Sequence, residues 1–348
     1  MKNNKAIYII LFVVICWMTY LTTSMLSSKQ EDKQKEITNI YNVSGFSTDM
    51  TKVVSQCESG IVTIRSAGNI MSGFVYAQNG DKVYIVTAFH GIGEGNIDVF
   101  FKSSYSLTAK LIGQDIYCDL AVLEVSTPYE IAPLKMGDSS LLKEGEFIIS
   151  IGTPKSLEYA GSAELGMVAY PERTVSNSII FEGNSYSYFL DAIQLSANLK
   201  PGYSGSPLIN MNGELVGMTT MSIDSDIIFA VRGNELKIIA DGIINQTNVH
   251  KVQLGLKGSY VKNMHNYEKA NLNLPIEVLG GMYVERTREN SLSNLAGIRS
   301  GDIITAINGI ELNSSDDYLK AAYTDTKSFE FTVIRGSETL KLTGNIND

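Results

Sequence analysis

Residues 201–208 read Pro201-Gly202-Tyr203-Ser204-Gly205-Ser206-Pro207-Leu208 and are followed by an apolar strand pattern. A serine hydroxyl is a poor nucleophile unless a tight turn presents it, backbone N–H groups stabilise the oxyanion and a histidine takes its proton. The glycines on either side of Ser204 permit such a turn. Ser204 is therefore a candidate nucleophile, and the alternative is an ordinary Gly-Ser loop between two strands.

A second segment, Val83-Tyr84-Ile85-Val86-Thr87-Ala88-Phe89-His90-Gly91, is a predicted strand that ends in a histidine. The other two histidines, His250 and His265, fall at or beyond the predicted end of the β-rich region. A base held at the rigid end of a strand suits proton transfer, although a lone histidine is more often structural. If the β-rich region contains a general base, it is His90.

A third segment, Tyr117-Cys118-Asp119-Leu120-Ala121-Val122-Leu123, places a carboxylate at the start of an apolar strand. A buried aspartate there can accept a hydrogen bond from the histidine Nδ1–H and stabilise the imidazolium. Asp98 and Asp115 are rival carboxylates, but neither directly precedes such an apolar run. The order along the chain is histidine, aspartate, serine, which is the order found in chymotrypsin.

The chain organisation predicts a mainly β protein with two folded units. Short β-type runs separated by Gly, Asn, Asp and Ser fill residues 51–247 and predict a barrel or sandwich. Asn79-Gly80 and Asn212-Gly213 predict tight hairpins. A helix is expected from Asn234 to Ile244, and a smaller α+β unit follows at residues 251–345.

The chain resembles the HtrA/Deg family of trypsin-like proteases. The resemblance rests on Thr87-Ala88-Phe89-His90, on Asp119-Leu120-Ala121-Val122-Leu123 and on the segment around Ser204. Ile151-Gly152-Thr153-Pro154 and Gly213-Glu214-Leu215-Val216-Gly217-Met218 are further matches, so it covers Val53 to Ile244. A later stretch, Asn294 to Gly309, is similar to the core of a PDZ domain. One anchor, one protease domain and one PDZ domain is the layout of the family's DegS-type members.

The resemblance implies a double β-barrel with the active site between the barrels. It also implies an oxyanion hole formed by the backbone N–H groups of Gly202 and Ser204. The chain departs from the family at Tyr203, where Asn or Asp is usual, at Ser206, which replaces a glycine, and at Phe89, which replaces a small residue. These departures bear on the geometry of the catalytic loops.

Two binding regions are expected by similarity. The wall of the primary specificity pocket is expected at Met218, Thr219, Thr220, Met221, Ile228, Phe229 and Ala230. Because none of these residues is charged, cleavage after small or medium apolar residues is predicted. In the PDZ domain, Gln253, Leu254, Gly255 and Leu256 resemble the loop whose backbone N–H groups bind a peptide's terminal carboxylate, and the adjacent strand pairs with the peptide.

The N-terminal residues 1–28 are expected to form a transmembrane anchor. Ala6 to Ser28 contains no charge and is long enough for a helix to cross a hydrocarbon core of ~30 Å. Lys2 and Lys5 favour a cytoplasmic N-terminus, which places the catalytic and PDZ domains on the periplasmic or extracytoplasmic side of the inner membrane. A cleaved signal peptide is the alternative. The polar residues 29–50 are expected to form a tether.

Composition excludes other classes of protein. The formal net charge is −9, so the chain has no basic excess with which to bind nucleic acid. No Cys and His cluster has metal-ligand spacing, and serine protease chemistry requires no cofactor. Cys57 and Cys118 are expected to be separate buried thiols, with a disulfide in an oxidising compartment as the alternative.

The resulting hypothesis is a serine endopeptidase that cleaves misfolded or regulatory envelope proteins. Binding of C-terminal peptides at the PDZ domain is expected to recruit substrate or regulate activity, and the family resemblance implies a homotrimer. The first alternative is a catalytically weak or inactive protease fold that acts as a peptide-binding or chaperone-like protein. A purely structural membrane-tethered protein is the second, and it leaves the histidine and serine segments unexplained.

Overall fold

The computed structural model describes residues 17–20, 22, 43–102, 105–181, 184–223, 227–247, 250–275 and 277–346. The chain divides into two compact units, Met1–Lys52 and Val53–Asp348, and each is considered by itself. Helix α2 (Val43–Cys57) begins inside the predicted tether and crosses that boundary. The predicted anchor lies outside the described residues except for 17–20 and 22. Within the described ranges, no helix combines the length and the apolar character needed to span a membrane.

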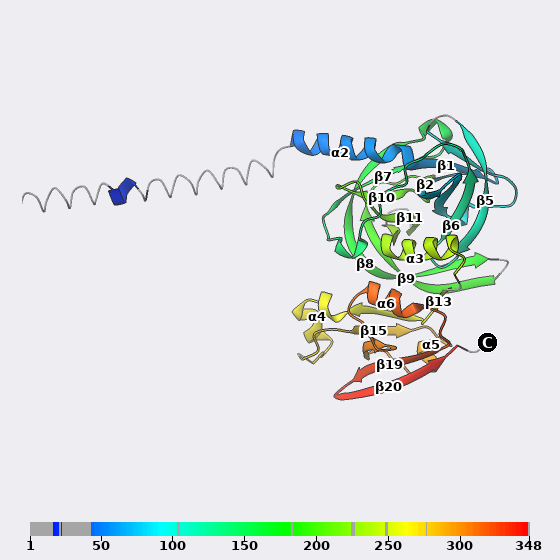
Figure 1. Ribbon diagram of the computed structural model, residues 1–348. Coiled ribbons are helices and arrows are strands. Elements are labelled where there is room, and N and C mark those ends of the chain that lie inside the picture. Colours follow the sequence, from blue (N-terminus) through cyan, green and yellow to red (C-terminus); the bar gives the residue numbers. More distant parts are fainter. Residues whose placement is uncertain are drawn as a thin grey trace, which may run out of the picture. The chain divides into compact units, whose positions relative to one another are not determined.

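The first barrel is a closed sheet in the order β1-β2-β3-β6-β5-β4 (Figure 1). Its strands are β1 (Ile61–Ser66), β2 (Asn69–Asn79), β3 (Lys82–Ala88), β4 (Ile97–Phe101), β5 (Ser106–Asp115) and β6 (Leu120–Ser126). The predicted Asn79-Gly80 hairpin joins β2 to β3, and Gly80 takes the positive φ of 62° that such a turn requires. Val62, Ile64, Val75, Ile85 and Leu123 are among the residues that fill the interior.

The second barrel is closed in the order β10-β11-β12-β9-β8-β7. Its strands are β7 (Phe147–Gly152), β8 (Ser162–Phe181), β9 (Asn184–Ser196), β10 (Pro207–Asn210), β11 (Leu215–Ile223) and β12 (Ile227–Arg232). The predicted Asn212-Gly213 turn joins β10 to β11, and the predicted helix is α3 (Gly233–Ile244). The expectation of a trypsin-like double barrel is therefore confirmed.

The C-terminal domain, which follows α3, contains a third sheet in the order β14-β15-β16-β19-β20, with β17 paired to β16. Its strands are β14 (Leu256–Tyr260), β15 (Met282–Thr287), β16 (Ile303–Ile307), β17 (Ile310–Glu311), β19 (Ser328–Arg335) and β20 (Glu338–Asn345). The helices are α4 (Asn266–Asn271), α5 (Leu292–Leu295) and α6 (Ser315–Ala322). Strands β13 (His250–Lys251) and β18 (Tyr323–Thr324) pair separately. Leu256, Phe329 and Phe331 belong to a core distinct from those of the barrels.

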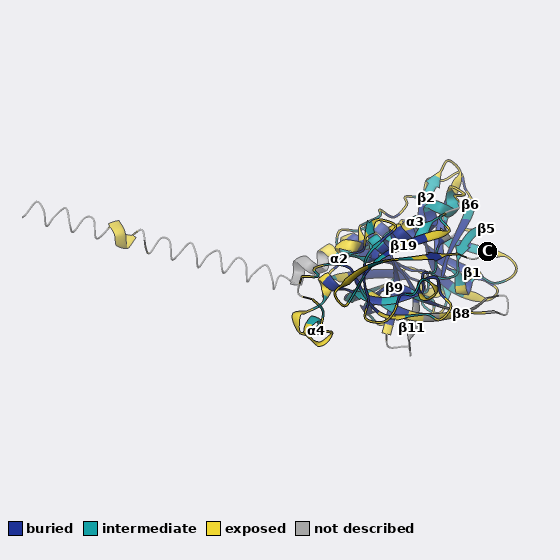
Figure 2. Ribbon diagram, turned by 90° about the horizontal axis from the view of Figure 1, so that it is seen from below, coloured by how far each residue is buried: buried dark blue, intermediate teal, exposed yellow. Residues whose placement is uncertain are grey.

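In the unit Val53–Asp348, buried residues concentrate in the strands, and exposed residues in loops and on α4 (Figure 2).

Cys57 and Cys118 are separate buried thiols, as expected. Cys57 Sγ lies 3.7 Å from the Gly213 carbonyl oxygen, whereas Cys118 Sγ lies 3.1 Å from Glu235 Oε1. Burial raises the pKa of both thiols, most strongly that of Cys118.

Candidate active site

His90 and Asp119 are brought together by the pairing of β3 with β6. Ala88, the last residue of β3, lies opposite Leu120, the first residue of β6. The residues that follow one strand and precede the other must therefore be neighbours, because antiparallel partners run in opposite directions. His90 occupies the short 3-10 helix Phe89–Gly91 that continues from β3.

Two hydrogen bonds join the residues. His90 Nδ1 lies 2.7 Å from Asp119 Oδ2, and the His90 backbone N–H donates to Asp119 Oδ1 at 2.7 Å. Asp119 takes a left-handed φ of 52°, a conformation that aspartate tolerates better than most residues. The carboxylate is nearly buried, with 11% of its side chain exposed, whereas 48% of the imidazole is exposed. The imidazole therefore remains partly accessible to solvent while its Nδ1 is fixed.

The hydrogen bond to Asp119 raises the pKa of His90, and partial burial of the ring opposes this effect. The hydrogen-bonded carboxylate favours the protonated imidazole by the same interaction that holds the ring in place. A histidine in this arrangement is a stronger base than a free imidazole.

Thr220, which the sequence predicts in the wall of the specificity pocket, is a hydrogen-bond partner of Asp119. Its Oγ1 donates to Asp119 Oδ2, so a strand of the second barrel, β11, contacts the carboxylate of the first. Thr220 lies far along the chain from Asp119, and no local pattern indicates that they meet. Only the closure of both barrels brings them together.

The loop that carries Ser204 is a tight turn. The Tyr203 N–H donates to the Lys200 carbonyl at 3.1 Å across Pro201 and Gly202. Gly202 has a φ of +101°, which suits the third position of a type II turn, where glycine is preferred. A side-chain carbon at Gly202 would lie 2.2 Å from the Thr153 carbonyl oxygen, so the position also excludes larger residues by contact.

The same loop lies against the end of the strand that leads to His90. The Ser72 N–H donates to the Ser204 carbonyl at 2.9 Å. At Gly205, a side-chain carbon would come within 2.6 Å of Thr87 Oγ1 and 2.8 Å of Ala88 N. The structure therefore places Ser204 beside the His90 segment. Among the contacts of the described residues, no hydrogen bond joins the Ser204 hydroxyl to His90, a bond that in apo enzymes often tightens only on substrate binding.

The loop leaves two particular N–H groups without acceptors among the described residues. Tyr203 N, Gly205 N and Ser206 N all donate to backbone carbonyls, of Lys200, Thr219 and Tyr203 respectively. By contrast, Gly202 N and Ser204 N have no acceptor within the described part of the chain. The Pro201 carbonyl accepts from Lys155 N at 2.8 Å, which directs the Gly202 N–H to the opposite side of that peptide.

The chain is similar to known serine proteases. A family model described as a trypsin-like peptidase domain matches residues 71–218. A serine protease Do-like HtrA of Bacillus subtilis (strain 168) is 30% identical over 312 residues, which cover 88% of this chain and 68% of that protein. A serine protease Do-like HtrA of Lactobacillus helveticus is 30% identical over 295 residues, which cover 82% and 68%. The chain belongs to the HtrA family of serine proteases.

Solved structures share the HtrA fold. The HtrA-type protease AlgW with a tripeptide superposes with a TM-score of 0.60 at 21% identity, covering 85% of this chain and 95% of that one. AlgW with a decapeptide gives 0.54 at 19% identity, covering 84% and 96%. At these identities the likeness concerns the fold alone.

The two departures from the HtrA motif around Ser204 are accommodated by specific contacts. Tyr203 is buried, its hydroxyl donates to the Ser162 carbonyl at 3.2 Å, and burial raises its pKa to about 12. Ser206 is fully buried, with its Oγ 2.7 Å from Ser150 Oγ and 2.8 Å from Thr219 Oγ1. Both side chains therefore brace the loop from behind, on the side away from solvent.

The residues expected to form the specificity pocket lie on β11 and β12. Ile228 and Ala230 pack in the core of the second barrel, and Met218 is fully buried. Thr219 Oγ1 donates to the Tyr203 carbonyl at 2.5 Å, and Thr220 binds Asp119. These five residues therefore take part in the barrel core or in contacts with Tyr203 and Asp119, and their assignment to the pocket wall stays a prediction. Phe229 is buried opposite Met221 in the β11–β12 ladder, and the Met221 side chain lies outside the described ones.

The loop expected to bind a terminal carboxylate lies directly before β14. Leu254 and Leu256 point into the core of the C-terminal domain, so this loop can offer a ligand mainly backbone groups. Gly255 has a φ of +74°, and a side-chain carbon there would lie 2.2 Å from Ser291 Cβ. Gln253 Nε2 is buried and has no hydrogen-bond partner among the described residues.

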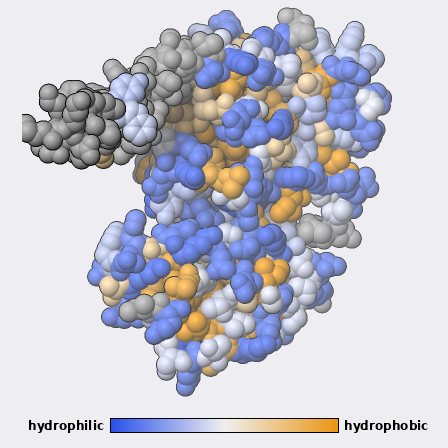
Figure 3. All heavy atoms as spheres, turned by 60° about the vertical axis from the view of Figure 1, so that its left-hand side comes forward, coloured by the Kyte–Doolittle hydropathy of each residue, from blue (hydrophilic) through white to orange (hydrophobic). Residues whose placement is uncertain are grey.

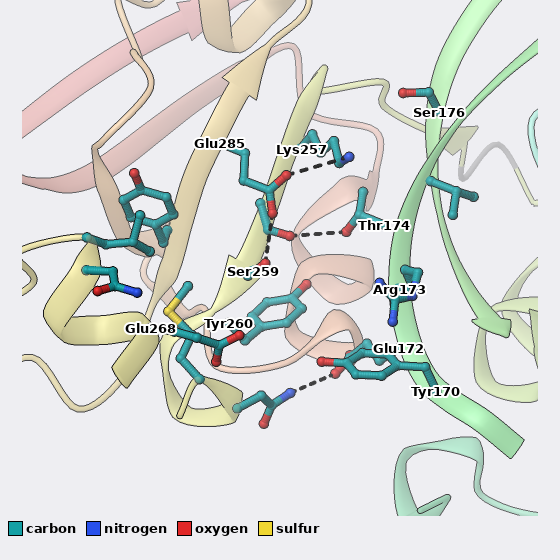
Figure 4. A pocket seen from close by; sticks show the side chains of 17 residues that line it. Tyr170, Glu172, Arg173, Thr174, Ser176, Lys257, Ser259, Tyr260, Glu268 and Glu285 are labelled. Carbon is teal, nitrogen blue, oxygen red and sulfur yellow. Dashed lines mark hydrogen bonds and ion pairs between the residues drawn. The ribbon is translucent and has the colours of Figure 1, made fainter. Parts of the chain in front are cut away.

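Beside this loop, β14 borders a cleft of about 880 Å³ (Figure 4). Among the residues that the structure describes, strand β14 pairs only with β15, and its other edge faces residues 170–176 of β8 across the cleft. Thr174 Oγ1 donates to the Gly258 carbonyl at 3.4 Å, which shows that a β14 acceptor points into the cleft. Lys257, Arg173, Glu172, Glu268 and Glu285 give the lining both signs of charge.

Proposed function

We propose that this HtrA-type serine protease is an endopeptidase that uses Ser204 as nucleophile, His90 as general base and Asp119 as the residue that orients His90. The Ser204 oxygen attacks the substrate carbonyl while His90 Nε2 takes its proton, and the same proton then passes to the leaving amine. The backbone N–H groups of Gly202 and Ser204 stabilise the oxyanion. No cofactor takes part in these steps.

One observation carries this proposal. The Asp119–His90 hydrogen bonds and the Ser204 turn meet at the end of β3, and the two loop N–H groups without an acceptor among the described residues are those of Gly202 and Ser204. Each group needed for acyl transfer is present in that one place. The buried positions of Tyr203 and Ser206 support an active loop over the binding-protein alternative, because neither side chain displaces a catalytic group.

The C-terminal domain is proposed to be a PDZ domain that binds C-terminal peptides of misfolded or regulatory proteins. An incoming peptide would add a strand at the open edge of β14 and place its carboxylate at residues 253–256. The cleft between β14 and β8 supports this proposal, since the edge of β14 that does not pair with β15 borders the cleft beside the loop (Figure 4). Peptide binding there is proposed to recruit substrate or regulate cleavage.

Residues 1–28 are proposed to anchor the protein in the cytoplasmic membrane, with the folded unit on the extracytoplasmic side. Hydrophobic residues gather in patches on the face shown in Figure 3. Phe147, Leu165 and Met167, on the adjacent strands β7 and β8, are each at least 37% exposed. The three exposed apolar side chains of β7 and β8 support contact between copies of the chain, and a homotrimer is proposed.

The test is cleavage of unfolded casein by the full chain in detergent, with and without a peptide that ends in apolar residues. Ser204→Ala is expected to abolish cleavage, and a fluorophosphonate should label the wild-type protein but neither Ser204→Ala nor His90→Ala. A peptide library should show cleavage after small or medium apolar residues.

If Ser204→Ala degrades casein as fast as the wild type, Ser204 is not the nucleophile. Absence of both labelling and cleavage would favour the chaperone-like alternative.

A further inference from the structure

Ser72, on β2 of the first barrel, directs its polar groups toward segments that carry the active site. Its hydroxyl donates to the Gly202 carbonyl at 2.7 Å and accepts from the Thr153 N–H at 2.8 Å. Its backbone N–H donates to the Ser204 carbonyl at 2.9 Å. Its own carbonyl accepts a hydrogen bond at 2.7 Å from Oγ1 of Thr87, a residue that lies three positions before His90 in the chain. One residue therefore contacts the nucleophile loop and the histidine strand together.

Ser72 is tightly enclosed, and its surroundings leave no room for a water molecule to replace its hydroxyl. Ser72 is fully buried, and a side-chain carbon at Gly152 would lie 2.5 Å from its hydroxyl oxygen. At Gly205, such a carbon would lie 2.3 Å from its carbonyl oxygen. The glycines at 152 and 205 thus allow the two loops to approach Ser72 closely. Without the hydroxyl, the Gly202 carbonyl and the Thr153 N–H would lose a partner in a site that is closed to water.

The segment Ile151-Gly152-Thr153-Pro154 forms the other side of this arrangement. The Thr153 N–H binds the Ser72 hydroxyl, and Thr153 Oγ1 is hydrogen-bonded to Thr63 Oγ1 of β1. Lys155 N donates to the Pro201 carbonyl. Lys155 N therefore holds the Pro201 carbonyl, and the Ser72 hydroxyl holds the Gly202 carbonyl. These two contacts set the orientation of the Gly202 N–H.

We propose that Ser72 is a positioning residue for the oxyanion: its hydroxyl holds the Gly202 carbonyl, and its backbone holds Ser204 and Thr87, so that the Gly202 and Ser204 N–H groups stay aligned with the nucleophile and the base. This inference rests on the proposed function. Ser72 touches no substrate atom, and its effect reaches the reaction through the loop. Alignment of this kind acts on the transition state more than on substrate binding, because the oxyanion forms only during attack.

The test compares Ser72→Ala with Ser139→Ala in the full chain. Ser139 is also a buried serine of the protease domain, and its hydroxyl accepts from Asn234 N at 3.1 Å, away from the nucleophile loop. Two peptide inhibitors are used with each variant. A peptide aldehyde adds reversibly to Ser204, forming an O–C bond as the C=O π bond opens and the hydroxyl proton passes to His90. The matching peptide alcohol fills the same subsites but cannot add.

Ser72→Ala is expected to lower kcat roughly tenfold to hundredfold, somewhat less than the loss of an oxyanion donor, with KM changed less than about twofold. Its affinity for the aldehyde should fall by the same factor as kcat, while its affinity for the alcohol is unchanged. Ser139→Ala should leave all four quantities within about twofold of the wild type.

Two results would overturn the assignment of Ser72. In one, Ser72→Ala matches Ser139→Ala in kcat and in both affinities. In the other, the aldehyde and alcohol affinities fall together, which indicates a general distortion of the substrate site. A wild-type protein with no turnover and no preference for the aldehyde over the alcohol would instead overturn the proposed function, and the role of Ser72 with it.

Discussion

The interface between the two barrels and the interface between the second barrel and the C-terminal domain are held by different chemistry. The inter-barrel interface includes hydroxyl and backbone hydrogen bonds made by Ser72, Thr63 and Thr153. The interdomain interface contains buried charges: Lys251 of β13 pairs with Glu235 of α3. Arg232 Nη1 also lies 3.0 Å from Asp316 Oδ1 of α6, in a charge contact outside hydrogen-bond geometry.

The inter-barrel interface mainly fixes the positions of groups, whereas the stability of the interdomain interface depends on the charges that it buries. A neutral hydroxyl bond is directional and carries no net charge, so it positions groups without depending on ionic conditions. A buried ion pair adds little net stability because desolvation offsets its attraction, yet removing one partner leaves an unpaired buried charge. The inter-barrel interface is therefore suited to holding catalytic groups, and the interdomain interface is sensitive to any change that alters one charge.

The largest effect is expected from Gly205→Ala, which breaks the inter-barrel interface. The new carbon would lie 2.3 Å from the Ser72 carbonyl oxygen and 2.8 Å from Ala88 N, at a φ of +82°. Activity should fall by roughly 10²-fold or more, because the loop must move away from His90. The measurement is kcat/KM on a peptide substrate. Gly80→Ala is the control, since its φ is also positive but no atom lies within 4 Å; equal losses in both variants would contradict close packing at Gly205.

Lys251→Met should destabilise the protein by about 3 kcal/mol or more, because Glu235, whose side chain is fully buried, loses its counter-charge. Catalysis by the folded fraction should change little. Urea unfolding measures the free energy, and the double variant Lys251→Met/Glu235→Gln should recover most of the loss. Lys237→Met, which breaks the exposed pair with Asp241, should cost less than about 1 kcal/mol. Equal costs at both lysines would remove the distinction between the interfaces.

The smallest effect concerns pH. Because hydrogen bonding to Asp119 raises the pKa of His90 and a general base must be neutral, kcat/KM should rise about tenfold per pH unit up to an inflection above 6.5. The same bond stabilises the folded state below pH 6.5, and this stabilisation is lost as pH rises through the higher folded pKa. The inflection should be unchanged in Lys251→Met. An inflection at or below 6.5, or one that moves in this variant, would contradict the assignment.

Much of the site could be predicted because its signals are local. His90 and Asp119 each flank an apolar strand, and Ser204 lies between glycines, so residue type and strand pattern suffice to single them out. For the pocket wall the signal in the sequence is weaker. Ile228 and Ala230 are apolar residues of a strand, and their pattern does not distinguish a pocket wall from a barrel interior. The partners Ser72 and Thr220 gave no signal, because serine and threonine are common in strands and their contacts lie far along the chain.

The sequence by itself determined the class of the fold and the hairpins at Asn79-Gly80 and Asn212-Gly213. It also singled out His90, Asp119 and Ser204 as candidate catalytic residues, because each signal depends on the periodicity or chemistry of a short segment. Only the tertiary structure decided which hydroxyls hold the catalytic groups and which charges meet between domains. Strand register and barrel closure set those contacts, and both depend on packing of the whole chain. Ser72 illustrates the division: its residue type is unremarkable in the sequence, and its neighbours come from three separate segments.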